Sequence, residues 1–308
     1  MMKETTLPYE REINMATQYL NKYTSLITAI HDIVGDSVHI VNKRPVSGGD
    51  INNAYALELS DGGCIFMKTN TVKNAPFFTA EMSGLKAIAD THAIGVPEVL
   101  GYGTDGDSYS FLLLSFIRSE RKIDKYWETF GTELAAMHAV SYDHSGFDED
   151  NFIGATRQIN DRRDTFLEFF RDCRLEPQFR MADRYLSDAD RKKRDRLLDH
   201  MDDYYIEPDH PSLVHGDLWS GNHMTGNDGK AWIIDPAVYI GHPEVDLAMT
   251  ELFGRCPESF YMSYNEASSL QPGYADRKDF YNLYQLLNHL NLFGSGYLSS
   301  VRQILARV

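Results

Sequence analysis

The chain has 308 residues, of which 45 are acidic and 30 are basic, and its formal net charge is −15. Nucleic acids and anionic membranes need a basic surface, so this charge balance argues against both kinds of partner. It leaves room for a phosphate-bearing ligand, which a few lysines, backbone amides or a metal ion can hold. The length fits two domains or one domain with two lobes.

The N-terminus and the cysteines bear on the compartment. The first residues, MMKETTLPYEREINM, have no apolar core and do not resemble a secretory signal. The longest apolar run, FLLLSFI, is far too short to cross a bilayer. Cys64, Cys173 and Cys256 are far apart and form neither a disulfide framework nor a metal signature. We therefore expect a reducing, cytoplasmic location.

The first part of the chain predicts mostly sheet. Apolar residues recur at helical spacing near the N-terminus, then give way to alternating, strand-like stretches. An Asp-Gly pair between two of these stretches is a hairpin signal. The predicted elements are a helix at 11–34, strands at 38–46, 54–60 and 64–70, a helix at 79–91, and strands at 96–104 and 109–117.

The second part predicts mostly helix. Its expected helices lie at 125–140, 162–173, 183–204, 245–254, 258–269, 277–293 and 300–308, with short strands at 212–216 and 231–235. A sheet-rich part joined to a helical part predicts an α+β fold of two lobes with a cleft between them. We place the boundary so that 1–117 is the nucleotide-binding lobe and 118–308 is the catalytic and substrate-binding lobe.

The stretch LVHGDLWSGN, residues 213–222, places polar and turn-forming residues directly behind a predicted strand end. It carries Asp217 and, five positions later, Asn222, and Asp235 ends the later strand-like stretch AWIID. If the two short strands were joined by a tight turn, these three side chains would converge. Oxygen ligands from Asn and Asp suit Mg²⁺, and a carboxylate that binds no metal can receive a hydroxyl proton.

Upstream residues complete the order found in kinases. Lys68 ends the strand-like stretch CIFMK, Glu81 lies in the next predicted helix, and SGGDINNAY before them is a glycine-containing turn able to cover phosphates. Kinase phosphoryl transfer uses such a turn, lysine and glutamate, then a catalytic Asp with an Asn five residues on, then a metal-binding Asp. Each piece is weak alone, so the prediction depends on their order and spacing.

Several longer stretches now show a family resemblance. LVHGDLWSGN, WIIDPAVYIGHPEVDLAMTELFG and HLNLFGSGY, with NFIGATRQIN and RLEPQ, resemble the fructosamine kinase family, within the aminoglycoside-phosphotransferase and protein-kinase-like group. The resemblance runs from about residue 38 to the C-terminus. It implies a kinase-like fold, with a small antiparallel-sheet lobe crossed by one helix and a larger helical lobe. It also implies ATP and Mg²⁺ as cofactors and phosphorylation of a sugar hydroxyl of ketoamines, after which the amine is released in a deglycation repair reaction.

The resemblance implies roles for residues of the second lobe. Asp217 resembles the catalytic base, and Asn222 and Asp235 resemble the metal ligands. His215 resembles a structural histidine that bonds the backbone, and Asp246 resembles a residue that anchors the catalytic loop. Trp219 resembles the residue that stacks on the ketoamine sugar, although it could simply plug the cleft floor.

In the first lobe the implied roles concern the nucleotide. Lys68 would contact the α- and β-phosphates and be fixed by Glu81. The residues implied to cover the phosphates or to face adenine are Gly48, Gly49, the Ser115 carbonyl and the Ile117 amide. Many family members carry a Cys in the phosphate-covering loop, and this chain has Asp50 there instead. That departure puts thiol regulation through the loop in doubt.

Other functions remain open from the sequence. The chain could be a kinase of the same fold that acts on another amine-bearing alcohol, such as an aminoglycoside or a choline-like compound. It could be a nucleotide-binding regulator without turnover. A metal-dependent hydrolase using His215, Asp217 and His223 would need further ligands, which the sequence does not offer at consistent spacing. The expected partner is a small-molecule or protein-bound ketoamine, and the expected state is a monomer or weak dimer.

Overall fold

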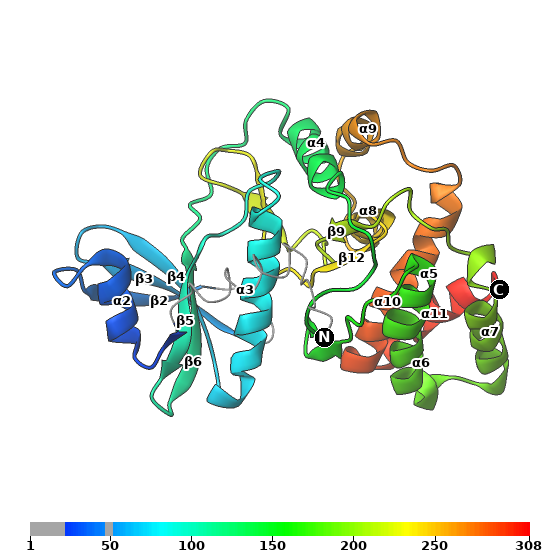
Figure 1. Ribbon diagram of the computed structural model, residues 1–308, viewed down its shortest axis with the longest axis horizontal. Coiled ribbons are helices and arrows are strands. Elements are labelled where there is room, and N and C mark those ends of the chain that lie inside the picture. Colours follow the sequence, from blue (N-terminus) through cyan, green and yellow to red (C-terminus); the bar gives the residue numbers. More distant parts are fainter. Residues whose placement is uncertain (1–21, 47–51) are drawn as a thin grey trace, which may run out of the picture. The chain divides into compact units, whose positions relative to one another are not determined.

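The computed structural model describes residues 22–46 and 52–308, and this part of the chain forms two compact units (Figure 1). The first unit comprises the described residues up to Lys86 together with Pro97–Ile117. The second comprises Ala87–Val96 and Arg118–Val308. The short segment 87–96, which the sequence-based boundary assigns to the first lobe, therefore belongs to the second unit.

A six-stranded sheet forms the centre of the first unit, in the order β1-β5-β6-β4-β3-β2. Neighbouring strands are antiparallel except β1 and β5, which are parallel. The strands are β1 (Lys22–Tyr23), β2 (Ile40–Val46), β3 (Asn53–Leu59), β4 (Cys64–Asn70), β5 (Val99–Asp105) and β6 (Tyr109–Ser115). The helices are α2 (Leu26–Val34) and α3 (Ala75–Ala89), the latter entered through a 3₁₀ turn, Val72–Asn74.

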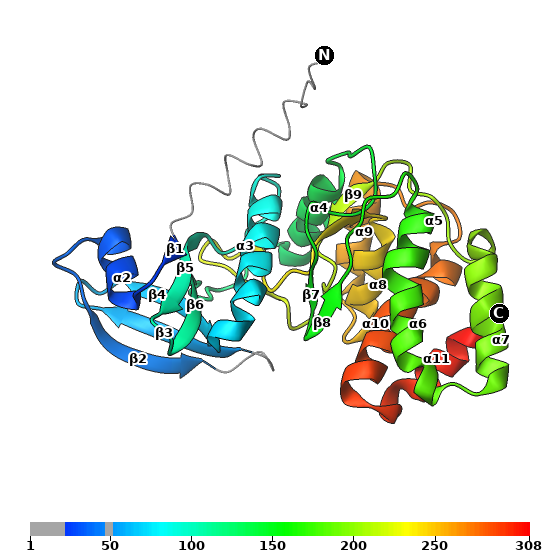
Figure 2. The ribbon, with the colours of Figure 1, turned by 60° about the horizontal axis from the view of Figure 1, so that its bottom comes forward.

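The two faces of this sheet are covered by different helices, and the alternation of side chains along a strand determines which helix each residue faces. Met67 on β4 lies opposite Leu113 on β6, and both pack in one core with Ala29 of α2. Side chains alternate between faces along a strand, so Lys68 points to the other face. Figures 1 and 2 both show α2 and α3 on opposite sides of the sheet. The strand register thus turns Lys68 toward α3.

The helix predicted over 11–34 differs from the structure at its start. Residues 11–21 lie outside the described residues, Lys22–Tyr23 form the short strand β1, and only Leu26–Val34 are helical. The carboxylate of Asp105 accepts the Leu26 N–H at 3.1 Å and so satisfies an N–H at the start of the helix. This cap comes from a residue far along the chain, so local apolar spacing could not locate the boundary.

The second unit is mostly helical. Its helices are α4 (Tyr126–His138), α5 (Phe166–Phe169), α6 (Glu176–Ala182), α7 (Asp188–Asp199), α8 (Glu244–Leu252), α9 (Glu258–Ala267), α10 (Tyr274–Phe293) and α11 (Leu298–Leu305). A π-helical turn, Phe170–Leu175, joins α5 to α6, and 3₁₀ turns occur at Asp183–Tyr185, Met201–Asp203 and Ser295–Tyr297. Its strands are β7 (Asn151–Ile153), β8 (Thr156–Gln158), β9 (Ser212–Val214), β10 (His223–Thr225), β11 (Ala231–Ile233) and β12 (Tyr239–Gly241).

Helix α10 runs through the core of the second unit. It packs against α8, α6 and α11, while α4 packs along α9 (Figure 2). Leu283, Leu287 and Leu290 of α10 are fully buried, which fixes the face that this helix turns inward. No helix in the described ranges is both long and apolar enough to cross a membrane.

The short strands of the second unit do not pair as the sequence predicts. The expectation was that 212–216 and 231–235 form one pair joined by a tight turn. Instead β9 pairs with β12, and β10 pairs with β11, both antiparallel. The tight turn lies within the β10–β11 hairpin, where the Gly226 N–H donates to the Lys230 carbonyl at 2.8 Å. The polar stretches after β9 and after β11 therefore run between two small ribbons.

Candidate active site

The loop that follows β9 closes on itself through Asn222. Its Nδ2 donates to the backbone carbonyl of Asp217 at 2.8 Å and to that residue's carboxylate at 3.0 Å. The Trp219 N–H also donates to the Asp217 carbonyl, at 3.1 Å, and the Asn222 N–H donates to the Trp219 carbonyl, at 2.9 Å. The five-residue spacing seen in the sequence thus brings the Asp and Asn side chains into direct contact.

Backbone bonds bring the segment after β11 to the same loop. The Ile234 N–H donates to the Asn222 carbonyl at 3.0 Å, and the Ala237 N–H donates to the His215 carbonyl at 2.9 Å. Asp235, between them, has a positive φ of 55°, a conformation that non-glycine residues adopt infrequently. Asp217, Asn222 and Asp235 are therefore gathered as predicted, although the strands that gather them pair differently.

The site concentrates negative charge. Burial raises the pKa of the Asp217 carboxyl well above its usual range, and the hydrogen bond from Asn222 opposes this shift. The nearby carboxylates of Asp235 and Asp246 raise that pKa further. Like charges that raise one another's proton affinity also attract a cation, so the arrangement favours a positively charged ligand.

His215 is structural in this geometry. It is fully buried, its Nε2 donates to the Ile234 carbonyl at 2.9 Å, and its Nδ1 accepts the Asp217 N–H at 3.3 Å. Burial lowers the pKa of the imidazole, which favours the neutral ring that these two bonds require. Both ring nitrogens are engaged by the backbone, so neither is available to take a proton from a substrate.

Asp246, at the start of α8, holds the backbone of the same loop. Its carboxylate is fully buried and accepts the N–H groups of His215 at 2.6 Å and Gly216 at 2.9 Å. The ring of His138, on α4, contacts the same carboxylate at 3.2 Å and the Tyr264 hydroxyl at 2.8 Å. Sequence reasoning missed His138 and Tyr264, because one polar residue in a helical pattern does not show which distant group it meets.

Trp219 is an exposed aromatic residue within the loop. Its side chain is 38% exposed, and its ring lies so close to Gly221 that a Cβ there would come within 2.3 Å of it. The glycine therefore lets the ring lie against the backbone of Gly221, four residues after Asp217. A ring with this exposure offers an apolar surface within the loop that carries Asp217 and Asn222.

The first unit contains a buried ion pair between β4 and α3. The Lys68 ammonium lies 2.6 Å from the Glu81 carboxylate, and the two side chains are 9% and 11% exposed. Ser115 ends β6, where its N–H donates to the Glu98 carbonyl and its hydroxyl accepts the Glu98 N–H, both at 2.9 Å. Gly48 and Gly49 lie outside the described residues.

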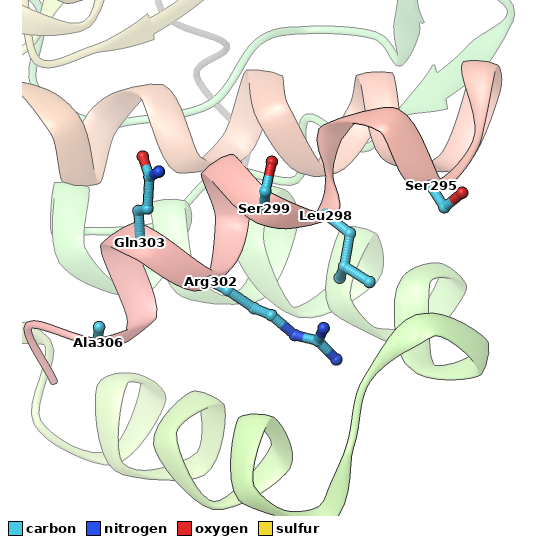
Figure 3. A pocket seen from close by; sticks show the side chains of 6 residues that line it. All are labelled: Ser295, Leu298, Ser299, Arg302, Gln303 and Ala306. Carbon is cyan, nitrogen blue, oxygen red and sulfur yellow. The ribbon is translucent and has the colours of Figure 1, made fainter.

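A cavity of about 590 Å³ along α11 lacks comparable chemistry (Figure 3). It is lined by Ser295, Leu298, Ser299, Arg302, Gln303 and Ala306. It offers no carboxylate, and the Arg302 guanidinium is already paired with Asp190 at 2.9 Å. We therefore place the candidate active site at the loop after β9.

A sheet with a buried lysine–glutamate pair, and a helical unit with an Asp and an Asn in one loop followed by a second Asp, together match the residue set of a kinase-like phosphotransferase. The model of the fructosamine kinase family matches residues 22–308. The chain therefore belongs to the fructosamine kinase family.

Individual relatives agree with this assignment. A probable ketoamine kinase of Synechocystis is 39% identical over 290 residues, which cover 92% of this chain and 95% of that protein. A chloroplastic protein-ribulosamine 3-kinase of Oryza sativa is 38% identical, over 88% of this chain and 80% of that one. The solved structure of a candidate fructosamine-3-kinase from Thermobifida fusca has a TM-score of 0.80 at 30% identity, covering 93% and 100% of the two chains.

More distant structures share the fold alone. An aminoglycoside phosphotransferase bound to a nucleotide analogue and hygromycin B has a TM-score of 0.61 at 18% identity, covering 92% of this chain and 96% of that one. The predicted kinase-like α+β fold, with a sheet-based unit and a helical unit, is confirmed.

Proposed function

We propose that this kinase transfers the γ-phosphoryl group of ATP to a sugar hydroxyl of ketoamines, the adducts of sugars and amines. Membership of the fructosamine kinase family over residues 22–308 carries the proposal. The relatives named ketoamine kinase and ribulosamine 3-kinase support the same substrate class. Trp219 supports it further, because an exposed aromatic ring suits both sugar C–H surfaces and a nearby cationic amine. The reaction would serve deglycation, since the phosphorylated product releases its amine.

Asp217 is the group we assign to the acceptor hydroxyl. Its carboxylate accepts one bond from Asn222 and is only half-buried, so it can still meet a substrate. Holding the hydroxyl in line and accepting its proton is the role of the corresponding Asp in kinases. His215 cannot take this role, because both of its ring nitrogens are bonded to the backbone.

Asn222 and Asp235 fit a magnesium ion. The Asn222 amide uses its Nδ2 in bonds to Asp217, and its Oδ1 accepts no hydrogen bond from the described residues. The described part of the chain contains no cluster of three or more His, Cys, Asp or Glu that could hold a metal ion without other ligands. Mg²⁺ typically takes one or two carboxylates and completes its shell with substrate phosphates and water. When bound, it would neutralise charge on the transferring phosphoryl group.

Residues of the first unit are assigned to the nucleotide. Lys68, with its ammonium held 2.6 Å from Glu81, would bind the α- and β-phosphates. The Ser115 carbonyl and the Ile117 amide would face adenine. The Ile117 N–H supports this assignment, because it donates no hydrogen bond within the described ranges. Gly48 and Gly49 are assigned to the loop over the phosphates on the sequence alone.

Asp235→Asn tests the metal assignment. Asn tolerates a positive φ, so this change should preserve the backbone at 55° while removing the carboxylate charge. We expect the Mg²⁺ concentration for half-maximal activity to rise at least about tenfold, with the melting temperature little changed. Titration of Mg²⁺ at saturating ATP measures it. An unchanged Mg²⁺ requirement would remove Asp235 from the ligand set.

A substrate panel tests the proposed activity. ATP consumption should be observed with fructosamine and ribulosamine derivatives of a simple amine, and not with an aminoglycoside or choline. In the same panel, Trp219→Leu should raise KM for the ketoamine about tenfold, because the aromatic face is lost, while leaving KM for ATP unchanged. Trp219→Phe, which keeps an aromatic face, is the matched control. Turnover of the aminoglycoside alone would refute the ketoamine assignment.

Cytoplasmic location and a monomeric or weakly dimeric state belong to the same proposal. Cys64, Cys173 and Cys256 are all free thiols, which suits a reducing compartment.

A further inference from the structure

The backbone of the catalytic loop is held by side chains at successive peptide groups. The Gly216 N–H donates to Asp246 at 2.9 Å, and the Asp217 carbonyl accepts from Asn222 at 2.8 Å. Between these, the Gly216 carbonyl accepts a bond of 2.8 Å from the Nε2 of Gln285. Asp246 and Asn222 are expected from the kinase pattern, whereas Gln285 comes from α10 and has no place in it.

The bond from Gln285 fixes one end of the peptide plane that precedes the catalytic side chain. The other end is the Asp217 N–H, which donates to the Nδ1 of His215 at 3.3 Å. A peptide group is planar and rigid, so holding its C=O and its N–H together sets its rotation. That rotation determines the direction in which the Cα–Cβ bond of Asp217 leaves the chain.

The amide of Gln285 is buried within the core around α10. Gln285 is 5% exposed, and the residues on either side of it along the helix, from Phe280 to Asn288, are all buried. Its Oε1 is buried and has no hydrogen-bond partner among the described residues. Burying an unpaired polar atom is unfavourable, so helix packing alone does not account for a glutamine here. The bond to the loop does account for it.

We propose that Gln285 is a positioning residue for phosphoryl transfer, acting on Asp217 through the Gly216 carbonyl. The proposal rests on the proposed function only in taking Asp217 as the group that orients the acceptor hydroxyl. Gln285 acts on the reaction solely by fixing the peptide that aims that carboxylate. Its loss should therefore slow the chemical step without weakening the binding of either substrate.

Gln285→Met tests this role. Methionine keeps the length and approximate volume of glutamine and removes the N–H donor, so the core should remain filled. We expect kcat to fall about ten- to a hundredfold, with KM for ATP and for the acceptor unchanged within about twofold. The matched control is Gln178→Met, the same exchange at a 2% exposed glutamine of α6 whose Nε2 donates to Asn288 at 3.2 Å. Because the Gln178 Oε1 also accepts a bond from Asn291 at 2.7 Å, this change should lower the melting temperature at least as much, and it should leave kcat intact.

The comparison uses whichever acceptor of the substrate panel the wild-type protein turns over. Absence of ketoamine turnover in the wild type would thus refute the proposed function. The ratio of kcat between Gln285→Met and wild type would still be measurable with another acceptor, or with water if no alcohol reacts. Equal kcat for Gln285→Met and wild type would overturn the inference. So would an equal loss of kcat in Gln178→Met, because the effect would then follow stability rather than the loop.

Discussion

Asp217→Asn should lower kcat by about 10³-fold or more while leaving the protein folded. Asparagine has the shape of aspartate, but it cannot accept the proton of the acceptor hydroxyl and carries no charge to orient it. The hydrogen bond from Asn222 at 3.0 Å and the backbone bonds of the loop would persist. Initial rates at saturating ATP and ketoamine measure the loss. Turnover within about tenfold of wild type would show that another group positions the hydroxyl.

The same substitution should not destabilise the protein. The pKa of Asp217 is raised in the folded state, so the folded protein holds this proton more tightly than the unfolded chain does. Stability from this group is therefore lost as pH rises through the raised pKa, and the ionised carboxylate opposes folding at neutral pH. Removing it should leave the melting temperature unchanged or higher, measured without nucleotide or Mg²⁺.

Asp246→Asn is the contrasting variant for that stability measurement. Asp246 accepts the N–H groups of His215 and Gly216 and is contacted by His138, so its charge is well compensated in the fold. An asparagine there would place its side-chain N–H₂ group near the N–H groups of His215 and Gly216, donor against donor. The lost hydrogen bond should lower the melting temperature. If the melting temperature of Asp217→Asn fell by the same amount as that of Asp246→Asn, the loss of activity in Asp217→Asn would reflect unfolding instead of a missing base.

The linear order of residues predicted which side chains meet better than it predicted how the short strands that carry them pair. Asp217 and Asn222 are neighbours within one loop, and Lys68 and Glu81 lie on consecutive elements, so sequence spacing alone placed each pair together. Strands of three residues carry almost no periodicity, and the pairing of β9 with β12 could not be predicted for that reason.

The supporting residues were missed for a different physical reason. His138 and Gln285 each lie in a helix and meet a partner far along the chain: His138 contacts Asp246, 108 positions away, and Gln285 contacts Gly216, 69 positions away. Local sequence shows that a helix carries a polar side chain, but not which atom that side chain will meet. The π-helical turn at Phe170–Leu175 is similar, because the fully buried Arg174 within it stacks 4.1 Å from the ring of Tyr239, distant in sequence.

Gly216→Ala should be the most disruptive small substitution in the loop. Gly216 has a φ of +80°, and a Cβ added there would lie 2.1 Å from the Ala237 carbonyl oxygen. Backbone strain and this clash together should lower the free energy of unfolding by about 3 kcal/mol or more. A backbone shift that relieved the clash would move Asp217 and reduce kcat.

Gly62→Ala is the matched control, because Gly62 has a φ of +86° with nothing within 4 Å of the added Cβ. The control should lose only about 1 kcal/mol, from backbone strain, and keep its activity. Denaturant unfolding of both variants separates the effect of backbone strain from that of the clash. Equal losses in the free energy of unfolding would show that the Ala237 carbonyl moves aside at no cost in stability.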